Sequence, residues 1–551
     1  MSGMTVLKRL ALRSALGISL LLVLLAASFT LATPARAHAI LVSSSPTADT
    51  VVPAAPAQIV LTFSEPVREV PGRIRVIGPD GRRIDRGKPT FNGPLVTIPV
   101  DQNVPRGTYL VSYRVISADS HPVAGGFTYS VGERTSPPDD SAAESRVDSV
   151  VATAVVVAKF LGYAGLVLLV GPVMVLTLLW PRRLSRTVPG RLIWAGAGLV
   201  AVSTLGGLWL QVPYTAGGGL FDVDTDGLMA VLGSPFGAAQ LTRLGVLLAA
   251  TLLIRPIVTG AGGRADRVIL VLLALVGFVT WPLGGHPAAS PVPPISVVAD
   301  TIHLVSMAVW LGGLLMLVLF LLRWANDTEL GAILPIWSRW ATLAVAGLVL
   351  AGVVQGLLEV GSLTALVSTT YGRLLLVKVG LVAVVLLVAA YSRHLVYKGL
   401  AAQRPGRLRR AVWGELAITA LVLAVTSTLV QTTPARTAVI DQATADYFST
   451  RLTSRLYSLQ VELYPARRGN NSLHLYAFTP DGQPQRVVEW KVTAALPAKG
   501  VEPIDVPLLS LTDSHVTGEV SMPTAGDWEF RFTLRVSDID QATVTVTVPI
   551  T

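Results

Sequence analysis

The sequence contains no cysteine in its 551 residues. The chain can therefore form neither a disulfide nor a thiolate metal site, and a bound transition metal must rely on imidazole, thioether, carboxylate or amine ligands. Charged residues are also scarce, at 14% of the chain against about a quarter in ordinary soluble proteins. Since hydrophobic residues make up 51% of the sequence, this composition indicates a protein that crosses a membrane several times.

The few charges are uneven in sign, with a formal net charge of +10. Such an excess can indicate nucleic-acid binding, but the arginines gather in short loops between apolar segments. Basic loops of this kind set the orientation of a membrane protein. The charge pattern is therefore interpreted as a topology signal, with the lipid membrane and not nucleic acid as the partner.

Residues 1–37 have the parts of a secretory signal peptide. Lys8 and Arg9 are basic, an apolar run follows, and Ala35-Arg36-Ala37 is typical of a signal-peptidase site. Cleavage there would make His38 the first residue of the mature protein. Its α-amine and imidazole would then chelate one metal ion, and copper(II) heads the divalent affinity order for such ligands. The alternative is that a histidine stands here by chance.

Two regions show the alternation of β-strands. In residues 38–132, apolar and polar residues alternate in QIVLTF, GRIRVIG, LVTIPV, GTYLVSYRVIS and GGFTYSV, which predicts a small antiparallel β-sandwich or barrel. Residues 133–149 are rich in proline, serine and acidic residues, as linkers are. Residues 440–551 alternate again and predict a second β-sandwich.

Between the two β regions, residues 150–431 contain eight apolar stretches long enough to cross a membrane as helices. They are expected near residues 155–180, 191–213, 234–258, 266–284, 295–322, 338–358, 372–392 and 411–431. The loops after the first, third and seventh stretches are basic, whereas those after the second, fourth and sixth have few or no cations. The positive-inside rule therefore places both ends of the chain outside the cytoplasmic membrane.

An Asp-x-His pattern, Asp119-Ser120-His121, adjoins a predicted strand of the first β region. Alternation places both side chains on one face. With the amine and imidazole of His38 they would form a set of two imidazoles, one amine and one carboxylate that suits tetragonal copper(II). Residues 38–148 contain no methionine, so a thioether site for copper(I) is not expected there. Taken alone, Asp119 and His121 are also compatible with a turn and a solvated histidine.

The segments HAILVSSSPTADTVVPAAPAQIVLTFSEPV and SADSHPVAGGFTYSVG resemble the periplasmic copper-binding family CopC. The resemblance implies a small β-barrel that binds Cu(II) through His38, Asp119 and His121. Glu65, in Phe-Ser-Glu-Pro, falls where the family has a glutamate near the site, which implies a supporting role behind the ligands. The methionine-rich Cu(I) site of some members has no counterpart in this sequence.

The apolar region resembles CopD, the inner-membrane partner of that family. The segments GGHPAA, DTIHLVSMAVWLGGL, SRWATLAVAGLVLAG and TTYGRLLLVKVGLV carry this resemblance. Fusion of the two domains implies copper uptake across the cytoplasmic membrane, with other extracytoplasmic copper carriers as candidate partners. Residues 440–551 resemble immunoglobulin-like modules attached to other copper membrane proteins.

Several polar residues fall in the outer half of the predicted membrane region. Because charged groups in lipid normally face a bundle interior or a water-filled cavity, they predict an outward-opening vestibule that receives copper. Its predicted residues are His286, Asp300, His303, Met307, Arg243, Glu359 and Lys378. The alternative is that Asp300 and Glu359 pair with Arg243 and Lys378 to hold helices together. Whether Cu(I) or Cu(II) crosses the membrane stays open.

Other functions stay open beside transport. One alternative is a role in copper resistance, sequestration or sensing without copper transport by this chain. Another is a histidine-brace copper oxidase or monooxygenase. Asp119 argues against the enzyme, because it would fill the position that oxygen chemistry needs. Haem ligation by His286, His303 and His394 is disfavoured, because His394 falls on the cytoplasmic side. His474 and His515 are expected to be solvated or capping residues.

Overall fold

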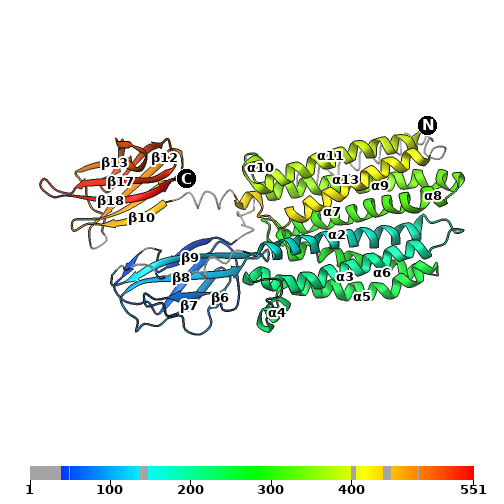
Figure 1. Ribbon diagram of the computed structural model, residues 1–551, viewed down its shortest axis with the longest axis horizontal. Helices are drawn as coiled ribbons and strands as arrows, with labels where there is room; N and C mark the ends of the chain where they lie inside the picture. The colour runs from blue at the N-terminus through cyan, green and yellow to red at the C-terminus, as the bar shows by residue number, and fades with distance from the viewer. Residues whose placement is uncertain are drawn as a thin grey trace.

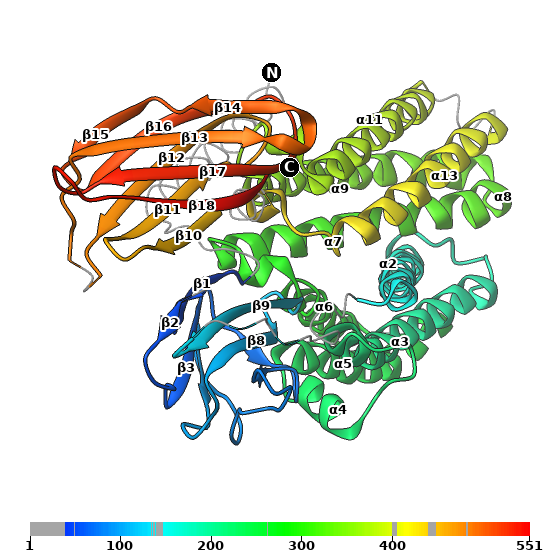
Figure 2. The same cartoon turned by 60° about the vertical axis from the view of Figure 1, so that its left-hand side comes forward.

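The computed structural model describes residues 39–133, 135, 138, 147–398, 405–438 and 448–550, except positions 49, 262, 481 and 482. The predicted signal peptide and His38 lie outside the described residues. Two β domains lie at the same end of a bundle of long helices (Figure 1). A second view shows the helices extending away from both β domains (Figure 2).

The N-terminal β domain consists of two packed sheets. The first sheet contains, in order, β1 (Leu41–Ser45), β3 (Gln58–Phe63), β7 (Leu95–Pro99) and β6 (Thr90–Asn92). The second sheet contains β2 (Val51–Val52), β9 (Pro122–Val131), β8 (Gly107–Ile116) and β4 (Arg68–Glu69). A further short strand, β5 (Arg75–Ile77), pairs with β8. Alternate residues of β3, Ile59, Leu61 and Phe63, point into the core between the sheets. The long strands β8 and β9 are joined by a short loop that contains Asp119.

Eight helices are long and apolar enough to cross a membrane, as the sequence predicts. They are α2 (Ser149–Leu178), α3 (Thr187–Ala216), α5 (Pro235–Thr259), α6 (Arg264–Val279), α7 (Pro293–Met316) with its extension to Trp324, α9 (Asp327–Val360), α11 (Thr370–Tyr397) and α13 (Pro405–Leu429). Shorter helices at the β-domain end are α4 (Thr225–Leu232), α10 (Ala365–Ser368), η1 (Pro282–Gly284) and η2 (His286–Ala289). The protein is therefore a multi-pass membrane protein.

Most of these helices begin before the apolar stretches that predict them. Helix α9 begins at Asp327, well before the predicted start at residue 338. The side chain of Asn326 accepts a hydrogen bond from the backbone N–H of Glu329, and the Glu329 carboxylate accepts one from the N–H of Asn326. This capping box starts the helix in polar sequence, where hydropathy alone gives no signal.

Helices α2 and α7 cross at the centre of the bundle. A Cβ atom placed on Gly171 of α2 would lie 2.2 Å from the Cα of Gly312 in α7, so only glycine permits this approach. Helix α7 is the most buried of the eight spans. Its polar residues therefore lie inside the bundle.

The C-terminal domain consists of two antiparallel sheets, whereas in the N-terminal domain, predicted as antiparallel, the short strand β2 pairs with β9 in parallel. One contains β10 (Phe448–Thr453), β11 (Ser458–Tyr464), β12 (Gly469–Phe478), β16 (His515–Met522) and β15 (Leu508–Thr512), and the other contains β14 (Val501–Asp505), β13 (Glu489–Leu496), β17 (Gly526–Arg535) and β18 (Gln541–Ile550). Trp528, Phe530 and Phe532 alternate along β17 and fill the core between the sheets. The predicted order of β domain, helical region and β domain is confirmed.

Candidate metal centre

The loop between β8 and β9 positions Asp119 and His121. Ser120 adopts a left-handed backbone conformation with φ of 71°, and the N–H of Ser117 donates to the carbonyl of His121 at 3.0 Å. The Asp119 carboxylate closes the same loop, because it accepts hydrogen bonds from the Ser117 hydroxyl and, at 3.2 Å, from the backbone N–H of His121. Asp119 is 1% exposed and His121 is 7% exposed. The turn therefore holds both side chains in a buried, fixed position.

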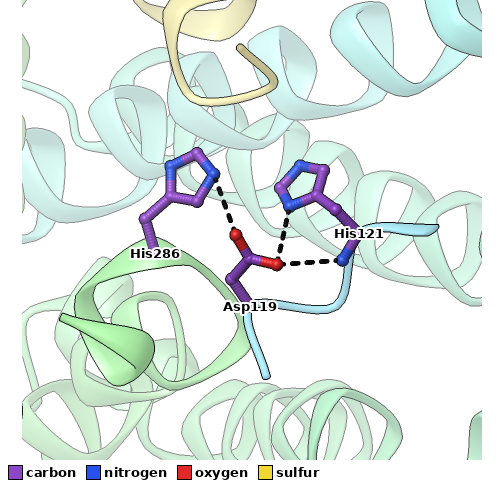
Figure 3. Close-up of side chains that lie close together, drawn as sticks. All are labelled: Asp119, His121 and His286. Carbon is purple, nitrogen blue, oxygen red and sulfur yellow. Dashed lines mark hydrogen bonds and ion pairs between the residues drawn. The ribbon is translucent and has the colours of Figure 1, made fainter. Parts of the chain in front are cut away.

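A histidine from the helical region completes this group. His286 begins η2, in the segment between α6 and α7, and its Nε2 lies 3.5 Å from Oδ2 of Asp119. The other carboxylate oxygen, Oδ1, lies 3.3 Å from Nδ1 of His121. The two imidazole rings are stacked, with centroids 4.9 Å apart and planes inclined by 22°. The carboxylate thus lies between imidazoles of two domains (Figure 3).

The geometry of these three residues fits a metal centre. One ligand atom from each of Asp119, His121 and His286 lies within 4.8 Å of the others, and all three residues are buried. Two imidazoles and one carboxylate are ligands that suit copper(II) or zinc. Among the described residues, this is the one group of three such side chains close enough to hold an ion.

Contacts with the end of α3 hold the loop against the helices. The Gln211 amide donates to the carbonyl of Ser120 at 2.9 Å. The guanidinium of Arg114, on β8, donates to the carbonyls of Thr215 at 2.5 Å and Tyr214 at 3.4 Å. These carbonyls belong to the last turn of α3, where the helix dipole favours a cation. A buried arginine of the β domain therefore caps a membrane helix.

Glu65 and Arg68 support the loop from the β-domain side. Oε1 of Glu65 accepts a hydrogen bond from the backbone N–H of Ala118 at 3.2 Å, so Glu65 contacts the loop that carries Asp119. The guanidinium of Arg68 lies 3.4 Å from the Ser120 hydroxyl. Burial lowers the pKa of Arg68, and the charge of Asp119 opposes that shift. The Asp119 carboxylate therefore lies in the field of a nearby cation.

A cavity of about 140 Å³ continues from this centre into the bundle. Its lining begins with Asp119, His121 and His286 and extends to Lys159 on α2, Arg243 on α5 and Asp300 on α7. Tyr163, Gln211, Tyr214 and Gln240 add polar groups to the wall. Three of the residues predicted for the vestibule, Arg243, His286 and Asp300, therefore share one cavity with the Asp-x-His pair.

The other predicted vestibule residues lie outside that lining. Nδ1 of His303 lies 3.1 Å from the carbonyl of Leu348, and Met307 is buried in the apolar core of the bundle. Glu359 forms an ion pair with Arg436 at 3.4 Å. Lys378 interacts electrostatically with Asp300. Their predicted roles in copper passage stay predictions.

Of the alternative pairing of carboxylates and cations, the interaction of Lys378 with Asp300 is present, but the hydrogen bonds of Asp300 and Arg243 go to other groups. Asp300 accepts a hydrogen bond from the Gln355 amide at 2.6 Å. Arg243 donates from Nε to the Thr280 hydroxyl and from a terminal nitrogen to the Thr280 carbonyl, both at 3.0 Å, and its guanidinium lies 4.0 Å from the centre of the Trp281 ring. The arginine is therefore held by neutral groups, and Asp300 by an amide.

Sequence reasoning did not select Lys159 or Gln211. Lys159 is the one cation inside the first apolar stretch, and a lone charge in a membrane helix is a signal for a polar cavity. Gln211 gave no comparable signal, because its function depends on the docked β domain.

Comparison with known families gives three matches along the chain. Residues 41–132 match the CopC domain, residues 149–291 match the N-terminal domain of the copper resistance protein D-like family, and residues 331–429 match copper resistance protein D. These segments coincide with the first β domain and with two parts of the helical bundle.

Two curated relatives and one solved structure are similar to this chain or to part of it. Copper transport protein CutJ from Bacillus subtilis (strain 168) is 27% identical over 470 residues, which cover 82% of this chain and 84% of CutJ. Copper resistance protein C from Escherichia coli is 36% identical over 107 residues, 18% of this chain and 83% of that protein. The crystal structure of CopC from Methylosinus trichosporium OB3b is 27% identical and covers 19% of this chain and 98% of that chain, with a TM-score of 0.15.

Arg114→Met tests the docking of the β domain. The substitution keeps a long side chain but removes the donors to the end of α3, and a lost hydrogen bond to a charged group costs about 1.5–3 kcal/mol. The undocked population should therefore rise about tenfold or more. Because the chain has no cysteine, spin labels at Arg82→Cys and Phe221→Cys report the domain distance by pulsed electron paramagnetic resonance.

We expect a broader distance distribution in Arg114→Met than in the wild type. Arg86→Met, which changes an exposed arginine of the same domain, serves as the control and should leave the distribution unchanged. A distribution in Arg114→Met identical to that of the control would contradict the docking role of Arg114.

Proposed function

Since this chain belongs to the family of CopC–CopD fusion proteins, we propose that it binds copper outside the cytoplasmic membrane and moves it inward. Copper(II) is the cargo and binds first to Asp119 and His121, with the processed terminus at His38 as a further ligand. His286 then takes the ion into the helical domain. The observation that supports this order is the 3.5 Å approach of His286 to Asp119.

A shared carboxylate suits the transfer of an ion between two domains. The two oxygens of Asp119 approach different imidazoles, one on the β domain and one on the helical domain. An ion bound to Asp119 can therefore exchange one imidazole for the other without losing all its protein ligands. Such stepwise exchange avoids release of the hydrated ion at the membrane surface.

The cavity below the centre supplies the next step. A divalent cation that enters it meets the cations of Lys159 and Arg243, which oppose its passage. The carboxylate of Asp300, which lines the same cavity and interacts electrostatically with Lys159, compensates for one of these charges. Asp300 is therefore the group that admits copper to the bundle, and its Gln355 partner fixes its position.

The direction of transport is inferred from the ends of the bundle. The basic loops after α2 and α5 and the C-terminal end of α11, with Arg393 and Lys398, lie at the end opposite the two β domains. The positive-inside rule puts that end in the cytoplasm and the β domains outside. Copper captured on the β domain then enters the cavity from the outside, which is the direction of uptake.

Substitutions at the centre distinguish capture from transfer. Asp119→Asn and His121→Ala remove a ligand of the β domain and should lower the copper affinity of the purified full-length protein at least tenfold. His286→Ala leaves those ligands in place, so copper uptake into oriented vesicles should fall more than affinity does. His394→Ala, an exposed histidine at the opposite end of the bundle, is the matched control.

Uptake by His286→Ala equal to that of the control would remove His286 from the pathway. Copper binding without flux in the wild-type vesicles would favour sequestration or sensing instead of transport.

The mature amino terminus provides an independent test. Mass spectrometry of the protein purified from membranes should give His38 as the first residue, because the signal-peptidase site ends at Ala37. Insertion of one alanine between Ala37 and His38 should then lower copper affinity at least tenfold, because the amine and imidazole no longer belong to one residue. A different mature terminus would exclude the chelate formed by the α-amine and imidazole of His38.

Asp300→Asn tests the charge in the cavity. Asparagine still offers a carbonyl oxygen to Gln355 but carries no charge, so the cavity keeps two cations against the single carboxylate of Asp119. Copper uptake should fall at least tenfold, while copper affinity at the Asp119 centre stays close to the wild type. Glu415→Gln, which changes a carboxylate outside this cavity, is the comparison. Wild-type uptake by Asp300→Asn would show that this charge is not needed.

A further inference from the structure

Two of the seven histidines lie side by side on the C-terminal domain. His474 belongs to β12 and His515 begins β16, the adjacent strand of the five-stranded sheet. In the strand register His474 lies opposite Thr517 and His515 lies opposite Tyr476, so the histidines are diagonal neighbours. Nδ1 of His474 is 3.3 Å from Nε2 of His515.

The pair lies on the outer face of the sheet. Leu473, Leu475 and Val516 alternate with the two histidines and fill the core, so the histidine side chains point the other way. Both histidines are half-buried and in contact with solvent. The sequence predicted two separate solvated or capping residues, whereas the pairing of β12 with β16 places them together.

Neighbouring side chains fix the two rings. The ring of His515 stacks on Tyr476, with centroids 4.1 Å apart and planes inclined by 15°. The Ser472 hydroxyl lies 3.4 Å from Nε2 of His474. Glu462 of β11 lies opposite His474 in the register and interacts electrostatically with His515. Two oriented imidazoles and a carboxylate therefore share one face.

We propose that His474 and His515, with the charge of Glu462 beside them, form a second copper-binding site that is separate from the Asp119 centre. One facing nitrogen carries the proton that the two rings share. When this proton moves to the other nitrogen of its own ring, both facing nitrogens present lone pairs to the same point. Imidazole nitrogens suit copper(II), the charge of Glu462 favours a cation beside them, and the chain offers no thiolate to compete.

The position of the C-terminal domain gives this second site a role. Both β domains lie at the same end of the bundle, so they face the same solution (Figures 1 and 2). A second site there holds copper on the same side of the bundle as the Asp119 centre and raises the amount of ion available to it. This role does not require that the helical domain transports the ion.

Copper titration of the purified full-length protein tests the proposal. The wild type should bind two equivalents of Cu²⁺, and the Asp119→Asn/His121→Ala double variant should keep one tight equivalent. Adding His474→Ala or His515→Phe to that double variant should weaken the remaining equivalent at least tenfold. The electron paramagnetic resonance spectrum of this remaining Cu²⁺ should show coupling to imidazole nitrogen, and the same substitutions should remove that coupling.

His515→Phe separates binding from folding, because phenylalanine keeps a ring for Tyr476 to stack on but has no ligand atom. Its melting temperature should match that of Thr517→Ala, a control on the same face that should retain the copper. A remaining equivalent that survives His474→Ala would overturn the second site. If the wild type instead binds a single equivalent of Cu²⁺, and only substitutions at His474 or His515 remove it, the Asp119 centre would be overturned.

Discussion

The Asp119 carboxylate contacts two imidazoles that belong to different domains, and the arrangement of the candidate metal centre depends on this contact. His121 comes from the same tight loop, whereas His286 comes from the segment between two membrane helices. A carboxylate in this position can hold a cation together with either imidazole. The centre therefore exists only while the β domain is docked on the bundle.

Docking in turn rests on a few buried polar contacts. Arg114 donates to carbonyls at the end of α3, and Gln211 of the same helix donates to the loop that contains Asp119. Burying a guanidinium is costly unless its hydrogen bonds are satisfied, and the free carbonyls of a helix terminus satisfy them. The end of α3 thus serves both as the edge of the membrane domain and as the attachment point of the β domain.

The carboxylates inside the bundle have separate partners. Asp300 is held by Gln355, Glu359 by Arg436 and Glu415 by Ser392. A buried carboxylate needs such partners because the surrounding medium screens its charge poorly. Of these three, Asp300 alone lines the cavity below the metal centre.

The sequence by itself determined the order of the domains, the eight apolar helices and the Asp119–His121 pair. These features depend on periodicity, on hydropathy over one segment and on residues two positions apart, all of which are local. The positions of the helix ends were predicted less accurately, because capping residues such as Asn326 lie in polar sequence. Only the tertiary structure decided that His286 joins Asp119, that Lys159 faces the same cavity and that His474 meets His515. Each of these contacts joins residues far apart in the chain, so it follows from domain docking, helix packing or strand pairing and not from any local pattern.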